Sequence, residues 1–118
     1  MSLNNQYTKY IAVGDASYTI QFSDDVITFT ITTGRTATLP LAGLCTPMSG
    51  QNEKKIVSST SSVGNVTIAV PSGNSLIGVG SVEPGQVVML SSNGTTIWSG
   101  YGGGGPAGTS GYSGPSGY

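Results

Sequence analysis

Apolar and polar residues alternate in short runs along the first hundred residues of the chain. In the run 26–32, Ile27, Phe29 and Ile31 alternate with threonines, which is the pattern of a strand with one buried face. Similar runs rich in β-branched and aromatic residues predict further strands. They span residues 18–22, 35–39, 55–59, 66–70, 86–90 and 95–98. Seven or eight short strands at a spacing of roughly ten residues predict an all-β head, a compact antiparallel sandwich or barrel-like fold.

Glycine, proline and asparagine separate these runs and predict the turns. Thr33-Gly34 and Asn93-Gly94 each lie between two strand-like runs, and each predicts a tight hairpin. Pro40 is expected to end the strand before it, since proline cannot donate to a central ladder. The segment 41–50 contains two glycines and a proline, so it is expected to be a loop or at best one helical turn.

The composition excludes several classes of function. The 118 residues include 4 Lys+Arg, 5 Asp+Glu, one Cys and no His, with a formal net charge of -1. Four cations cannot form the basic surface that nucleic acid requires. Without histidine the chain lacks the commonest general base and the commonest transition-metal ligand, and one cysteine cannot build a disulfide or a thiolate zinc site. We therefore expect no catalytic residue, metal, cofactor, nucleic acid or membrane insertion, and the low charge favours self-association.

The last part of the chain has a different composition from the first hundred residues. From Gly105 onward, glycine stands at every third position, and Pro106 and Pro115 each follow a glycine directly. Three polyproline-II chains wound together need a glycine at every third residue, because only glycine fits at their axis. The phased glycines predict a short collagen-like triple helix and hence a homotrimer; the alternative is a flexible or disordered Gly/Ser end. These packing positions are Gly105, Gly108, Gly111, Gly114 and Gly117.

The predicted organisation has three parts: an N-terminal arm or attachment segment at 1–17, the β head at 18–100 and the collagen-like tail at 101–118. Within the head, Asp24-Asp25 is expected to form a turn, since neighbours in an extended chain point to opposite faces and make a poor acid–base pair. Lys54-Lys55 is expected to protect a strand edge, with an acidic partner as the alternative. Cys45 is expected to be a small buried side chain. Trp98 is a candidate interface or ligand contact, although a core position is the commoner role of such a residue.

The order of these strands resembles a β domain of bacteriophage tail-fibre and related virion proteins. The resemblance covers about residues 25 to 98 and rests on the strand–turn–strand unit at 25–40, ending in Thr-Leu-Pro, and on the closing hairpin at 87–98 with its Asn-Gly-Thr turn and final Trp. Between them, residues 54–59, 65–68 and 75–78 match the family's next strand and its valine-threonine-isoleucine and isoleucine-glycine pattern. The tail is similar in composition to collagen-like repeats in structural proteins of marine and cyanobacterial phages.

The resemblance implies a non-enzymatic, homotrimeric structural protein of the virion that contacts other virion proteins, as a fibre, spike or appendage. Two alternatives stay open: a trimeric capsid decoration protein, and an adhesin-like head that binds a host glycan or surface protein. An aromatic or polar groove near Trp98 or in the loop 41–51 would favour the adhesin. Two carboxylates facing each other across a cleft would favour an enzyme instead.

Overall fold

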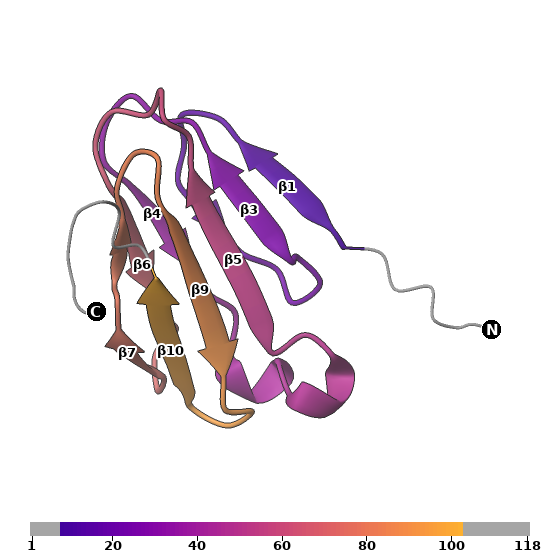
Figure 1. Ribbon diagram of the computed structural model, residues 1–118. Coiled ribbons are helices and arrows are strands. Elements are labelled where there is room, and N and C mark those ends of the chain that lie inside the picture. Colours follow the sequence, from indigo (N-terminus) through magenta and orange to yellow (C-terminus); the bar gives the residue numbers. More distant parts are fainter. Residues whose placement is uncertain (1–7, 103–118) are drawn as a thin grey trace.

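Two β-sheets packed face to face make up residues 8–102, the part of the chain that the computed structural model describes. The sheets have the strand orders β1-β3-β5-β9-β10-β7 and β2-β4-β6-β8, and the six-stranded sheet lies in front in Figure 1. The strands are β1 (Tyr10–Val13), β2 (Tyr18–Thr19), β3 (Val26–Phe29), β4 (Arg35–Thr38), β5 (Glu53–Ser58), β6 (Val66–Ala69), β7 (Ser75–Gly78), β8 (Ser81–Val82), β9 (Val87–Ser92) and β10 (Ile97–Gly102). The only helical elements in this part of the chain are the 3-10 turns η1 (Ala42–Leu44) and η2 (Pro47–Ser49). The all-β prediction is therefore confirmed.

The chain winds back and forth between the sheets from β1 to β6, placing alternate strands in alternate sheets. Strands two apart in sequence then lie side by side and run in the same direction. The pairs β1–β3, β3–β5, β2–β4, β4–β6 and β7–β10 are parallel, and β5–β9, β9–β10 and β6–β8 are antiparallel. The predicted sandwich is present, but the prediction that its strands are antiparallel was wrong, because alternation determines which side of a strand is buried but not which strand pairs with it.

The segment between β3 and β4 shows most clearly how the observed strand pairing differs from the predicted one. Thr33-Gly34 does not close a hairpin, because β3 and β4 belong to different sheets and the chain crosses between them. Ile31 is buried in the crossing, and its N–H donates to the Ser62 hydroxyl at 3.1 Å. The crossing also passes close to Gly64, where a Cβ atom would lie 2.9 Å from the Gly34 nitrogen. The two glycines let the chain segments approach.

The second predicted hairpin is confirmed. β9 and β10 are antiparallel, and the turn between them is organised by the Asn93 side chain. Its Oδ1 atom accepts hydrogen bonds from the backbone N–H groups of Thr95, Thr96 and Ile97 at 2.9, 3.1 and 3.0 Å. Gly94 has φ +85°, a conformation that glycine adopts without strain.

The sheet extends beyond the predicted bounds of the head at both ends. β1 lies within the predicted N-terminal arm, yet it pairs with β3, so the described part of that segment belongs to the head. β10 continues to Gly102, two residues past the predicted boundary. The strands β1, β7 and β8 were not predicted as strands. The tail glycines and prolines, from Gly105 to Gly117, lie outside the described residues.

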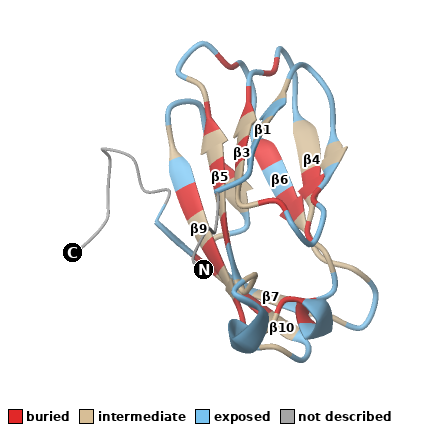
Figure 2. Cartoon of the chain, turned by 90° about the vertical axis from the view of Figure 1, so that its right-hand side faces the viewer, coloured by how far each residue is buried: buried red, intermediate tan, exposed pale blue. Residues whose placement is uncertain are grey.

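The core fills the space between the two sheets. Buried residues recur at alternate positions along β3, β5 and β9, as the colouring of Figure 2 shows. The buried apolar side chains come from both sheets and from the loop 41–45. They are Ile20, Ile27, Phe29, Ile31, Ala37, Leu39, Ala42, Cys45, Ile56, Val66, Ile68, Val82, Val88, Leu90 and Trp98.

Candidate functional site

Asp24 is a buried carboxylate at the turn before β3. The Tyr18 hydroxyl donates to its Oδ2 atom at 2.7 Å, the Gln21 N–H donates to the same oxygen at 2.8 Å, and the Lys9 ammonium lies 3.3 Å from Oδ1. Burial raises the pKa of Asp24, but these hydrogen bonds and the nearby cation outweigh it and hold the pKa below its usual value. On the phenol, burial and the adjacent carboxylate raise the pKa of Tyr18 to about 12. These hydrogen bonds from Tyr18 and Gln21 connect the turn at Asp24 to β2. The predicted role of Asp24 in a turn is confirmed.

Asp25 also contacts Lys9, but through the backbone of that residue. The Lys9 backbone N–H donates to its Oδ2 atom at 2.7 Å. The Asp25 and Val26 N–H groups both donate to the Lys9 carbonyl at 3.1 Å. Both neighbouring aspartates therefore hold Lys9, just before β1, against the turn that precedes β3, and no hydrogen bond joins the two carboxylates.

Lys54 is the least expected polar residue of the fold, because its side chain is almost fully buried, with 1% exposed. Its ammonium group donates to the carbonyls of Phe22 at 2.6 Å and Asp24 at 2.5 Å, and lies 3.5 Å from the Gln51 Oε1 atom. Burial disfavours the charged form of Lys54 and so lowers its pKa, and no carboxylate is bonded to the ammonium group to offset this effect. Lys54 thereby links the loop before β3 to β5.

The prediction that Lys54-Lys55 protects a strand edge was wrong. β5 lies in the middle of the six-stranded sheet, between β3 and β9. The local sequence of β5 does not show that the parallel strand β3 pairs with it and covers that edge. A signal for the burial was nevertheless present: Lys54 is in phase with Ile56 and Ser58, which are also buried, whereas Lys55 is on the opposite side of the strand.

We expect Lys54→Met to lower the free energy of unfolding by about 1–3 kcal/mol at neutral pH, because the buried Asp24 carbonyl and the part-buried Phe22 carbonyl lose their donor. In the wild type the unfolded state binds the Lys54 proton more readily than the folded state. The free energy of unfolding should therefore rise with pH from the lowered pKa of Lys54 toward the ordinary value of 10.5. Urea titrations between pH 7 and 10 measure this slope. Lys54→Met should flatten it; a Lys54→Met chain with the slope of the wild type would contradict the assignment.

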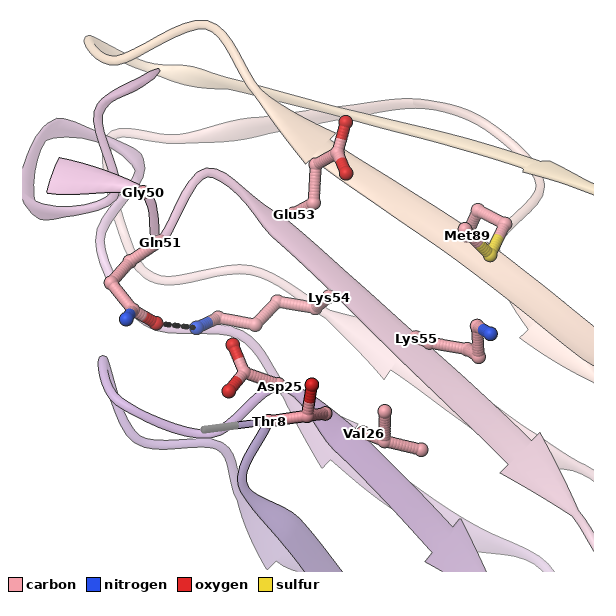
Figure 3. Close-up of a pocket in the computed structure, with 9 residues that line it drawn as sticks. All are labelled: Thr8, Asp25, Val26, Gly50, Gln51, Glu53, Lys54, Lys55 and Met89. Atoms are coloured by element: carbon pink, nitrogen blue, oxygen red, sulfur yellow. Dashed lines mark hydrogen bonds between the residues drawn. The ribbon is translucent and has the colours of Figure 1, made fainter. Parts of the chain in front are cut away.

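An open pocket of about 390 Å³ lies where β3, β5 and β9 approach the end of η2. Figure 3 shows the residues around it, including Gln51 beside the Lys54 ammonium, and Lys55 and Met89 further along the strands. The lining is mostly polar and carries both signs of charge. It consists of Thr8, Asp25, Val26, Gly50, Gln51, Glu53, Lys54, Lys55 and Met89. Within residues 8–102 no aromatic side chain lines this pocket, so this part of the chain provides no stacking surface of the kind that sugars commonly use.

Trp98 is not a surface residue. Its side chain is 0% exposed, and the indole N–H donates to the Pro40 carbonyl at 2.9 Å. Its prediction as an interface or ligand contact was therefore wrong, and the core role applies. Cys45 is buried as predicted, and burial raises the pKa of its thiol, which keeps it in the less reactive protonated form.

The two outer faces of the sandwich differ in chemistry. On the four-stranded sheet, Thr36 is paired with Thr67 and Thr67 with Ser81, so hydroxyl groups follow one another across the sheet. On the six-stranded sheet, one row of paired residues crosses five strands and is mostly apolar. That row is Tyr10, Val26, Lys55, Met89 and Tyr101. Periodicity places these residues outward, but their alignment depends on the pairing of strands far apart in sequence.

Residues 8–102 bring together no group of three or more metal-ligating side chains, and they contain no helix long and apolar enough to cross a membrane. Comparison with known proteins gives no family: no family model, no curated protein and no solved structure matches this chain.

Proposed function

We propose that this protein is a non-enzymatic structural protein of a bacteriophage virion, in which an all-β head trimerises and carries a collagen-like tail. The observation that carries the proposal is the glycine at every third position from Gly105 to Gly117. A collagen-like segment requires three chains. Four complete triplets are too few to hold three chains together, so the head must supply most of the association.

The fold of the head is compatible with this role. The buried charged groups Asp24 and Lys54 are bonded to the turns and strands around them, which gives them structural tasks. The apolar row on the six-stranded sheet offers a surface for packing against other copies. A fibre, spike or other appendage, and a capsid decoration protein, all use such a trimer.

The adhesin alternative has one observation in its favour. The pocket includes Gly50 and Gln51, at the end of the loop 41–51, where a polar groove would favour the adhesin. Specific glycan binding on an array, lost in a Gln51→Ala variant, would favour the adhesin. Since the described residues place no aromatic side chain in the pocket, the structural role is the better supported one.

The tail provides the sharpest test of the proposal by mutation. We expect Gly111→Ala to lower the thermal midpoint of trimer dissociation, because a side chain does not fit at the axis of a triple helix. The neighbouring Ser110→Ala keeps the glycine period and should leave the midpoint unchanged. The midpoint can be followed by light scattering during heating. Equal midpoints for the two variants would contradict a triple-helical tail.

A further inference from the structure

We infer that the outer face of the six-stranded sheet, around β9 and β10, is the surface that packs against two further copies of this chain. The inference rests on the proposed trimer and identifies the surface that forms it. The face is defined by Val26, Lys55, Val87, Met89 and Tyr101, and we call it the β9–β10 face.

The first observation is a row of apolar side chains in register on the outer face of the six-stranded sheet; other exposed apolar side chains, such as Met48 and Val63, lie outside the strands. Tyr101 is 50% exposed, and Tyr10, at the far end of the same row, is 73% exposed. Val26 and Met89 lie between them in register, and Val87 is exposed in the next row. The whole outer face of the sheet spans on the order of 400 Å² in projection, for six strands about 4.8 Å apart and about five residues long, and the apolar row covers part of it.

The second observation is the place where the tail begins. Gly102, the last described residue, is the last residue of β10 and directly follows Tyr101. It has φ +93°, and a Cβ atom there would lie 3.1 Å from the Val87 carbonyl oxygen. Three tails that meet on one axis require three copies of Gly102 close to that axis. The neighbouring Tyr101, Met89 and Val87 of each copy are then near the axis as well.

The third observation is the distribution of charge. The face carries Glu53 and Lys55 two residues apart on β5, so both project from the same side of the strand. Within residues 8–102 neither forms an ion pair; the ion pairs there are Lys9–Asp24 and Arg35–Asp15. Because the face carries one acidic and one basic side chain, Glu53 of one copy can form an ion pair with Lys55 of another copy. The hydroxyl-rich face of the other sheet has no comparable apolar row and suits contact with water.

These observations select a second copy as the occupant. A foreign partner would explain exposed apolar side chains, but it would not explain why Tyr101, Met89 and Val87 lie beside Gly102, where the tail leaves the head. Three such faces around an axis would bury the apolar row and point the three tails in one direction.

The experiment uses the full chain and compares Met89→Glu with Thr67→Glu. Thr67 is an exposed outward position on β6, so the same charge enters a strand of the other sheet. Sedimentation equilibrium at micromolar concentration should give three chains for the wild type and for Thr67→Glu, and one chain for Met89→Glu. The fluorescence of Trp98, the only tryptophan, should remain that of a buried indole and show that the variant is folded.

A second measurement does not depend on breaking the assembly. Cys45 is the only cysteine of the chain and is buried, so a short bis-maleimide should join no copies of the wild type. Tyr101→Cys should give covalent dimers, and the control Thr67→Cys should give none. A trimeric Met89→Glu, or a trimeric Tyr101→Cys chain without covalent dimers, would overturn the β9–β10 face and leave the trimer standing. A wild type of one chain would overturn the trimer itself and this inference with it.

Discussion

Replacing Trp98 with alanine is expected to lower the free energy of unfolding by about 3–5 kcal/mol, the usual cost of removing a large buried aromatic side chain. Trp98 is fully buried on β10, in the six-stranded sheet, and its N–H bonds to Pro40, which follows β4 in the other sheet. The side chain therefore fills the core and connects the two layers. A domain is stable by only about 5–15 kcal/mol in total, so this loss is a large part of it.

Trp98→Phe separates the two contributions. It keeps an aromatic ring in the core but removes the donor to the Pro40 carbonyl, so it should cost less than the alanine variant. Chemical denaturation followed by far-ultraviolet circular dichroism measures both changes. A loss of less than about 1 kcal/mol in Trp98→Ala would show that this residue is not packed as described, since cavities in a closed core cost more.

The variant Gly100→Ala is expected to destabilise the protein by about 3 kcal/mol, at the upper end of the usual cost of overpacking. Gly100 is buried on β10 between β7 and β9. A Cβ atom added there would collide with the backbone carbonyl oxygen of Val79 and lie 3.3 Å from Leu90 Cδ2. Since Val79 also donates its N–H to the Gly100 carbonyl at 2.9 Å, the backbone cannot move away without losing that bond.

Gly14→Ala is the matched control. A Cβ atom at Gly14 meets no atom within 4 Å, and its φ is not in the positive range. This variant should be neutral or stabilised by about 0.4–1 kcal/mol, since alanine restricts the unfolded chain. The loss of blue-shifted Trp98 emission on urea addition gives both unfolding curves. Equal midpoints for Gly100→Ala and Gly14→Ala would contradict the close packing of the 78–80 segment against β10.

The local pattern of residues was sufficient to predict most strands and the turn at Asn93-Gly94. In these cases the signal comes from neighbouring residues: alternation sets the buried side, and an Asn side chain with a following glycine closes the turn. It was also sufficient for the burial of Cys45. β7 and β8 were missed because they are short and rich in serine and glycine, and pairing with longer strands gives them their extended form.

Strand partners could not be predicted in the same way. Thr33-Gly34 has the sequence of a hairpin turn, but the chain crosses there from one sheet to the other. The close approach that requires glycine at this crossing involves Gly64, which is some thirty residues away in sequence. The burial of Lys54 depends on the carbonyls of Phe22 and Asp24, which local sequence does not place near it. The β9–β10 face was missed for the same reason, since it combines residues from several strands.

The mass of the full chain in solution tests the central claim most directly. Sedimentation equilibrium at micromolar concentration should give three times the chain mass of 11.9 kDa, with no change on dilution across the micromolar range. A stable species of one chain under these conditions would contradict the trimer, and with it both the collagen-like tail and the proposed role of the head.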